Sequence, residues 1–527
     1  MKQTSRNILS LFTSDVVRRV LGFFSLAYLA RTIGMEEFGA VAISWTVLSY
    51  ASVLSSAGLH VMGVRTVAQK SQEFGVGEMV LTRFVNALAV LFVTACIIVV
   101  ALPLVRFGWL ILLTSCSVVL HALFLEWYFQ GREEMMVIGA GRIASALVYL
   151  LILLLWVKSS ADIMVTGIAA LVGDASLAAL LWWKYIAGGS RTSFTPLEAE
   201  RPAPIHRGGD ARPSQPKRLL RRSRQCSLVL ANIKFNAPLA PLDNLSNGVN
   251  ELLTGFTLSA RRWKAILQSS LPLGIGGIIA FVSTNFPIMA VGLILSTKEA
   301  GVFSAGFRLV SFLLMIDRVL GSVLLPASSR LQSANPAVLS ETLSRTLRWM
   351  FIAGLPLCVG GGMLAEEILV FVFGPAYLAS AAVFQIVLWY FLATMIHTVF
   401  VSAMIATGRE KEFAHIMVIS GLIYGFTIIG LILAVGVVGG AMALVLSEAA
   451  TVWMMHRAVR STVVIHLPKH TLGLLMAVGA MAAVLFFAPP LHVMAKIALG
   501  GLIFLITLVV SKGISLGDLR ELRSQFV

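Results

Sequence analysis

Long apolar runs separated by short polar connections dominate the sequence. A run needs about 20 residues to cross a bilayer as a helix, and runs of about that length occur fourteen times. They lie at roughly 8–30, 40–62, 80–102, 108–129, 137–157, 162–186, 266–295, 302–327, 348–373, 378–406, 413–435, 437–459, 471–490 and 491–511. The pattern predicts an all-α polytopic membrane protein with about fourteen transmembrane helices.

The first apolar run contains charged residues far from its ends. If Arg18 and Arg19 flanked the membrane, only residues 20–30 would remain before Arg31, so the span must start near Ile8. At about 1.5 Å of rise per residue, the two arginines then lie about 15 Å deep, near the middle of the hydrocarbon layer. A charge at that depth costs about 2.5–3.5 kcal/mol on insertion scales. We therefore expect both side chains to face protein or water.

Two interpretations of these arginines are open. Asp15 stands three residues before Arg18 and four before Arg19, so the three could form an ion cluster within one helix that only positions it. Alternatively, the arginines line a substrate path, as charged residues inside membranes commonly do. One carboxylate cannot neutralise two guanidinium groups, which favours the second interpretation.

Composition agrees with the apolar pattern. The chain has 527 residues, of which 58% are hydrophobic and 13% charged, which is typical of a protein with many membrane spans. No cleavage site follows the first run, so we expect it to be retained as a helix. No phosphate-binding loop is present, and His466-x-x-x-His470 lacks further metal ligands, so neither a nucleotide cofactor nor zinc is expected.

The distribution of Lys and Arg predicts the orientation. If the N-terminus is cytoplasmic, eighteen of these residues fall on the cytoplasmic tails and connections and five on the outer side. By the positive-inside rule, both termini are then cytoplasmic. The connection after the sixth helix adds fourteen more, including the run at 217–224. The net charge of +16 is mainly a topology signal, and nucleic acid is not an expected partner.

Short sequence matches indicate an internal repeat. Gly131-Arg132-Glu133-Glu134 resembles Gly408-Arg409-Glu410-Lys411, and Glu36-Glu37-Phe38-Gly39 resembles Lys298-Glu299-Ala300-Gly301. Each pair lies six helices apart, an even number, so the copies should be parallel and related by an axis along the membrane normal. We expect two six-helix bundles with two helices appended.

This organisation predicts four regions. They are an N-terminal six-helix lobe at 1–187, a basic cytoplasmic linker at 188–262 that ends in an amphipathic helix, a C-terminal six-helix lobe at 263–460, and two helices with a cytoplasmic tail at 461–527. Pro, Gly, Ser and Arg dominate the first part of the linker. Its predicted role is to tether the two lobes, with a regulatory partner site as the alternative.

Several stretches resemble the polysaccharide (oligosaccharide) flippase family of the multidrug/oligosaccharidyl-lipid/polysaccharide exporter superfamily. They are Arg19-Val20-Leu21-Gly22-Phe23, Ala30-Arg31-Thr32-Ile33-Gly34 and Phe38-Gly39 in the first half, with Ser270-Leu271-Pro272-Leu273 and Ala300-Gly301-Val302-Phe303-Ser304-Ala305 in the second. The first is also similar to lipid II flippases. The resemblance implies a V-shaped transporter that moves undecaprenyl-diphosphate-linked oligosaccharides across the bacterial inner membrane by alternating access, for cell-surface or exopolysaccharide biosynthesis.

Arginines inside the spans are the candidate substrate-binding residues. A planar guanidinium binds phosphate oxygens through two hydrogen bonds and stays charged when it is removed from water. We expect Arg18, Arg19 and Arg308 to contact the diphosphate or the sugars, and Arg318, beside Asp317, is a fourth candidate. For Arg308, which is near a helix end, the alternative is a side chain that extends to the outer membrane surface.

Carboxylates inside the spans are candidates for a cavity or for ion coupling. Asp15 and Asp317 are near the arginines, whereas Asp174 and Glu448 occupy equivalent positions in the sixth and twelfth helices. Each could bind H⁺ or Na⁺, or bond a neighbouring helix. Many relatives carry an acidic residue about where Phe286 stands, so this chain departs from the family pattern there.

Two other functions are compatible with parts of the sequence. A cation-coupled multidrug antiporter shares the superfamily fold, and the charged residues inside the spans do not exclude it. A membrane-embedded glycan polymerase or ligase is the enzymatic alternative, but the expected outer loops are short and no catalytic residue is expected.

For the flippase, the predicted partners are a lipid-linked oligosaccharide, membrane lipids, a coupling ion and the glycan polymerase machinery.

Overall fold

The computed structural model describes residues 2–69, 75–101, 106–188, 260–463, 471–511 and 513. Over these residues the secondary structure is helical, and no strand occurs among them. The predicted all-α class is thus confirmed. The expected amphipathic helix after Leu242, the rest of the linker over 189–259, His466, His470 and the tail after residue 513 lie outside the described residues.

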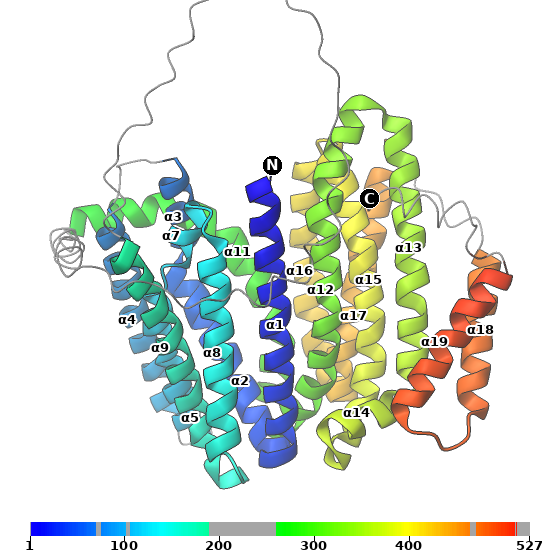
Figure 1. The fold of residues 1–527 in the computed structure, drawn as a ribbon, viewed down its shortest axis with the longest axis horizontal. Coiled ribbons are helices and arrows are strands. Elements are labelled where there is room, and N and C mark those ends of the chain that lie inside the picture. The colour runs from blue at the N-terminus through cyan, green and yellow to red at the C-terminus, as the bar shows by residue number, and fades with distance from the viewer. Residues whose placement is uncertain are drawn as a thin grey trace, which may run out of the picture.

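The first half of the chain forms nine α-helices and one short 3₁₀ helix over the described residues. They are α1 (Lys2–Ile33), α2 (Met35–Ser56), α3 (Leu59–Ala68), α4 (Val76–Ala101), α5 (Gly108–Ser115), α6 (Ser117–Ala122), α7 (Glu126–Gly131), α8 (Met135–Trp156), η1 (Ser160–Asp162) and α9 (Ile163–Gly188). The single span expected at 108–129 is divided into α5, α6 and α7. Figure 1 shows these helices grouped on one side, with α1 between them and the second group.

The second half begins with the long helix α11. The elements are α11 (Ala260–Ile294), α12 (Thr297–Ala334), α13 (Pro336–Met363), α14 (Ala365–Phe373), η3 (Pro375–Ser380), α15 (Ala381–Ala406), α16 (Glu410–Val435), α17 (Val437–Val459), α18 (Thr471–Phe487) and α19 (Val493–Val510). Helices α12 to α17 form the second group, and α18 and α19 stand at its outer edge (Figure 1).

Eleven spans among the described residues are long and apolar enough to cross a membrane. This number supports a multi-pass protein but does not reach the fourteen expected from the sequence. Helix α1 is absent from the eleven because Asp15, Arg18 and Arg19 lower the hydropathy of its apolar run. Helix α18 has 17 residues and is shorter than each of the eleven spans.

Local chemistry explains where several helices meet. Gly34 separates α1 from α2 with φ +88°, and Gly436 separates α16 from α17 with φ +70°, conformations that residues with a side chain rarely adopt. Asn335 caps α13: its side chain accepts a hydrogen bond from the backbone N of Ala337 at 3.0 Å, and Pro336 occupies the first helical position.

The two groups of helices contact each other closely at one end. There α2 crosses α12 so tightly that a Cβ atom on Gly39 would stand 1.9 Å from the carbonyl oxygen of Thr297, and one on Gly301 would stand 2.2 Å from that of Met35. Both glycines belong to the predicted repeat. Because a Cβ at either position would meet backbone atoms, glycine is what permits this contact.

Polar contacts reinforce the same end. Arg31, in the last turn of α1, donates from Nε to the carbonyl of Val372 at 2.9 Å and also bonds that of Phe371. The Tyr377 hydroxyl donates to the carbonyl of Gly34 at 3.3 Å. We call these contacts and the Gly39–Gly301 crossing the interlobe seal.

Helix α11 contacts both groups. Near its start, Arg262 pairs with Glu78 of α4 at 2.6 Å, and Trp263 Nε1 donates to Asn86 at 3.1 Å. Near its end, the Phe286 ring contacts Tyr424 of α16, with the centroids 6.4 Å apart. The predicted division into domains at residues 262 and 263 falls inside this helix, and it stays a prediction.

Candidate functional site

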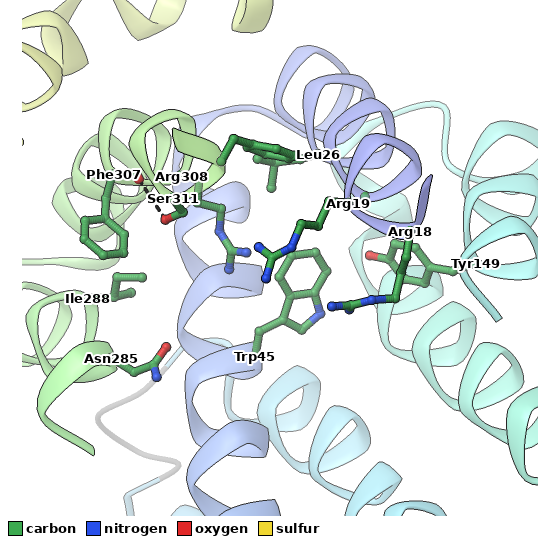
Figure 2. Close-up of a pocket in the computed structure, with 12 residues that line it drawn as sticks. Arg18, Arg19, Leu26, Trp45, Tyr149, Asn285, Ile288, Phe307, Arg308 and Ser311 are labelled. Atoms are coloured by element: carbon green, nitrogen blue, oxygen red, sulfur yellow. Dashed lines mark hydrogen bonds between the residues drawn. The ribbon is translucent and has the colours of Figure 1, made fainter. Parts of the chain in front are cut away.

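A cavity of about 290 Å³ lies between the two groups of helices. Helices α1, α2, α8, α11 and α12 contribute to its wall, so residues from both halves of the chain form it. Its lining residues are Arg18, Arg19, Gly22, Leu26, Trp45, Tyr149, Asn285, Ile288, Phe307, Arg308, Ser311 and Phe312. Figure 2 shows the three arginine side chains pointing into the space beside Trp45.

Arg18 and Arg19 reach this cavity from α1. Arg18 Nη2 is 3.0 Å from Asp15 Oδ1, and Arg19 Nε is 2.9 Å from Asp15 Oδ2. The ion cluster considered from the sequence therefore forms, and the same two arginines also line the cavity. The Arg18 side chain is 43% exposed and that of Arg19 is 20% exposed, so each can meet a ligand without leaving Asp15.

Arg308 reaches the cavity from α12. Its Nε donates to Ser304 Oγ, one turn earlier, at 3.3 Å. Its guanidinium carbon stands 4.7 Å from the centroid of the Trp45 ring, a cation–π contact that joins the two halves of the chain. The side chain therefore faces the cavity in this structure, as the substrate-binding hypothesis expects.

The charge in this region is unbalanced. Three guanidinium groups face the cavity, and the carboxylate that pairs with two of them is Asp15. Figure 2 shows Arg19 and Arg308 pointing toward one another. Like charges that face each other in a region of low dielectric constant favour a bound anion between them.

An uncharged wall faces the arginines. The Trp45 and Tyr149 rings lie 6.0 Å apart at 56°. The Tyr149 hydroxyl is buried and makes no hydrogen bond with any residue that the structure describes. The site thus combines guanidinium groups with an aromatic surface, groups suited to a ligand that carries both phosphate and sugar.

Arg318, the fourth predicted contact, lies outside this cavity. It is an exposed residue further along α12 and does not belong to the lining. Its neighbour Asp317 accepts a hydrogen bond from Thr398 Oγ1 at 2.6 Å. Side chains of adjacent residues on a helix do not face each other, and Asp317 is directed toward α15.

The two remaining predicted carboxylates each bond a histidine. Asp174 of α9 meets His121 Nε2 at 3.0 Å, and the other nitrogen of that ring, Nδ1, is 2.6 Å from Ser52 Oγ. Glu448 of α17 meets His397 Nδ1 at 2.5 Å. Both pairs stand apart from the cavity lining.

Sequence reasoning missed Trp45, Tyr149, His121 and His397. The two histidines carried a usable signal, because they stand in the predicted fourth and tenth spans, again six helices apart. The aromatic residues carried none, since tryptophan and tyrosine are frequent in membrane spans for unrelated reasons.

Two family models match parts of the chain. Residues 4–197 match one family described as polysaccharide biosynthesis protein, and residues 251–382 match a second family with the same description. Both parts of the chain are thus similar to polysaccharide biosynthesis proteins. The resemblance inferred from sequence stretches to a polysaccharide flippase family is thereby confirmed.

Solved structures of two transporters share the fold of this chain. The chain is similar to lipid II flippase MurJ in an inward closed conformation, with 13% identity and a TM-score of 0.66 over 95% of this chain and 98% of that one. It is also similar to an inward-facing multidrug resistance MATE transporter, with 11% identity and a TM-score of 0.59 over 84% and 96%. No curated protein matches the chain.

Proposed function

We propose that this protein is a flippase that carries an undecaprenyl-diphosphate-linked oligosaccharide across the bacterial inner membrane, for cell-surface or exopolysaccharide biosynthesis. The observation that carries the proposal is the convergence of Arg18, Arg19 and Arg308 beside Trp45, in a cavity formed by both halves of the chain. Similarity to polysaccharide biosynthesis proteins supports the class of substrate.

The chemistry of the cavity suits a diphosphate. Each phosphate oxygen accepts hydrogen bonds from the guanidinium forks, and charge-assisted bonds of this kind are about twice as strong as neutral ones. Asp15 holds Arg18 and Arg19 in place, so little side-chain entropy is lost when the anion binds. Trp45 and Tyr149 are then available to the first sugar.

Alternating access requires the interlobe seal to open. If both termini are cytoplasmic, as the distribution of Lys and Arg predicts, the seal lies on the outer side of the membrane. The contacts of Arg31 and Tyr377 with backbone carbonyls can break without leaving buried charge, because Arg31 is exposed to water. We infer that loading takes place on the inner side, before this seal opens.

The cavity charge argues against a cation-coupled multidrug antiporter. The fold is shared with MATE transporters and so does not separate the two functions. Three guanidinium groups around one space repel an organic cation, whereas they attract a diphosphate. Glycan transfer is disfavoured because the family and the fold are those of transporters.

A vesicle assay tests the proposal. The purified protein is placed in lipid vesicles with a fluorescent undecaprenyl-diphosphate sugar, and a membrane-impermeant quencher reports the fraction of probe in the outer leaflet. We expect the wild type to exchange the probe between leaflets. Arg18→Ala with Arg19→Ala, and Arg308→Ala alone, should each slow exchange at least about tenfold, the effect of about 1.4 kcal/mol.

Arg132→Ala is the matched control. Arg132 lies between α7 and α8 and pairs with Glu134 at 2.9 Å, outside the cavity lining. It should exchange the probe at the wild-type rate. A wild-type protein that leaves the lipid-linked sugar in place but moves ethidium against a proton gradient would establish the antiporter instead.

A further inference from the structure

Each half of the chain contains one histidine–carboxylate pair, and the two pairs occupy corresponding places. His121 and Asp174 belong to the fourth and sixth predicted spans, and His397 and Glu448 to the tenth and twelfth. Both pairs are thus related by the six-helix repeat. Their side chains are at most 26% exposed.

The pair in the first half is balanced in charge. One imidazole, that of His121, faces one carboxylate, and its second nitrogen bonds the Ser52 hydroxyl. Arg83 of α4 donates to the carbonyl of His121 at 2.9 Å, and Tyr149 of α8 is close enough to Asp174 to interact electrostatically. With the imidazole protonated, the pair itself has no net charge.

The pair in the second half has an additional carboxylate. Asp317 of α12 bonds Thr398, the residue that follows His397, at 2.6 Å. It interacts electrostatically with both His397 and Glu448. We call Asp317, His397 and Glu448 the C-lobe cluster. It contains one imidazole for two carboxylates.

The other polar groups around the C-lobe cluster do not supply the missing charge. Tyr390 of α15 interacts with both carboxylates, and Tyr424 of α16 interacts with Tyr390, but tyrosine hydroxyls are neutral at physiological pH. Arg318 of α12 also acts on Asp317, yet it is exposed and forms no ion pair with a residue that the structure describes. Water therefore screens its charge more than that of the cluster.

We propose that the C-lobe cluster is a proton-binding site that takes up and releases one proton in each transport cycle. With His397 protonated and both carboxylates ionised, the cluster carries one net negative charge, which costs several kcal/mol inside a membrane. One further proton on either carboxylate makes it neutral. When that proton leaves to water, the negative charge remains on the pair of carboxylates.

A change in the charge of the C-lobe cluster can affect both the cavity and the interlobe seal, because α12 connects all three. Asp317 is on α12, the helix that also carries Arg308 in the cavity and Gly301 in the interlobe seal. At about 1.5 Å per residue, it is about 13 Å along the helix from Arg308. A continuous helix transmits a shift over that distance as a rigid element.

A proton suits the cluster better than a metal ion. Among the residues that the structure describes, no group of three or more His, Cys, Asp or Glu side chains is arranged to hold a metal. The contacts that the cluster makes are hydrogen bonds, Glu448 with His397 at 2.5 Å and Asp317 with Thr398 at 2.6 Å. Hydrogen-bonded side chains of this kind hold and pass a proton, which needs no ligand shell of the kind that a metal ion requires.

Infrared difference spectroscopy on the full chain in lipid nanodiscs tests this inference directly. Spectra are compared between about pH 6 and pH 8, the range in which ordinary carboxylates stay ionised. We expect a carboxylic acid C=O band at the lower pH that is lost at the higher pH. Asp317→Asn or Glu448→Gln should shift or abolish the band, and Asp174→Asn, the repeat-related control, should retain it.

Three results would overturn the proposal. They are a wild-type protein without a carboxylic acid band in this range, a band that survives both Asp317→Asn and Glu448→Gln, and a band that responds to replacement of sodium by choline at constant pH. The first of these needs no variant, so a substitution that prevents folding cannot leave the question open. The readout uses no sugar lipid, and its result is independent of the proposed substrate.

Discussion

Gly39 and Gly301 pack against one another where α2 crosses α12. A Cβ on Gly39 would stand 2.7 Å from the backbone nitrogen of Gly301, and one on Gly301 would stand 3.2 Å from that of Gly39. These are the last residues of the two matching tetrapeptides that indicated the repeat. The two matching tetrapeptides thus meet at the interlobe seal.

Gly39→Ala should weaken the interlobe seal. The added methyl group would overlap the backbone carbonyl of Thr297, which cannot rotate away, so α2 and α12 must separate. Overpacking of this kind costs about 1–3 kcal/mol. We expect the apparent Tm of the purified protein to fall by a few degrees, measured by intrinsic fluorescence during heating.

Gly421→Ala in α16 is the control, because a Cβ there meets nothing within 4 Å. It should leave the apparent Tm unchanged or raise it slightly, since alanine is the better helix former. Equal Tm values for Gly39→Ala and the wild type would show that the crossing tolerates a side chain.

Cysteines at positions 18 and 19 should react with a water-soluble maleimide, because both native side chains line the cavity and thiolate chemistry needs water. Position 18 should react faster, since Arg18 is 43% exposed and Arg19 only 20%.

The control is Phe92→Cys, on an exposed apolar face of α4, which should stay unlabelled in membranes. Mass spectrometry of each variant, made without the native cysteines, gives the rates. If neither position 18 nor position 19 reacts, the cavity is not hydrated and the arginines form a structural ion cluster.

Arg31→Ala should loosen the end of the molecule where α1 meets α14. The carbonyls of Phe371 and Val372 lose their donor, and water can replace it, so the effect on total stability should be small. We expect faster maleimide labelling of a cysteine that replaces Phe38, which is buried against Tyr377 in the seal. Arg31→Lys should show an intermediate rate, because it retains the charge but not the fork. Identical labelling rates with and without the Arg31→Ala substitution would mean that this contact does not hold the seal.

Reporter fusions should place residues 35 and 298 outside the cell and residues 75 and 410 inside. The structure adds one constraint, because Met35 contacts Gly301 and so residues 35 and 298 must share a side. A reporter that is periplasmic at residue 35 and cytoplasmic at residue 298 would contradict both the charge argument and the crossing of α2 over α12.

The depth of Arg18 and Arg19 could be calculated from the sequence, because helix rise and bilayer thickness are fixed quantities. Whether they line a cavity or only pair with Asp15 could not. The structure shows both, since one carboxylate holds two guanidinium groups while their outer faces stay accessible. The sequence could not distinguish these two roles, because one guanidinium group can pair with Asp15 through one edge and contact a ligand through another.

The two histidine–carboxylate pairs show what spacing along the chain cannot predict. Spacing along the chain located Asp174 and Glu448 in equivalent helices, but it gave no partner for either. His121 and His397 come from other helices, and only the rotation of each helix about its axis decides which side chains meet. Arg318 illustrates the same point, because one step of about 100° from Asp317 takes its side chain away from the cluster.

The sequence by itself determined the all-α membrane class of the protein and the depth of the charged residues in its first span. In a bilayer every backbone polar group must be satisfied within the protein, so long apolar runs in this chain form helices. Counting the runs gave fourteen spans, whereas eleven are long and apolar enough among the described residues. The tertiary structure decided which residues meet: Arg308 with Trp45, Gly39 with Gly301, and Asp317 with Thr398 beside the His397–Glu448 pair. These contacts join helices that are distant in the chain, and they depend on how closely each pair of helices can pack, which no local pattern encodes.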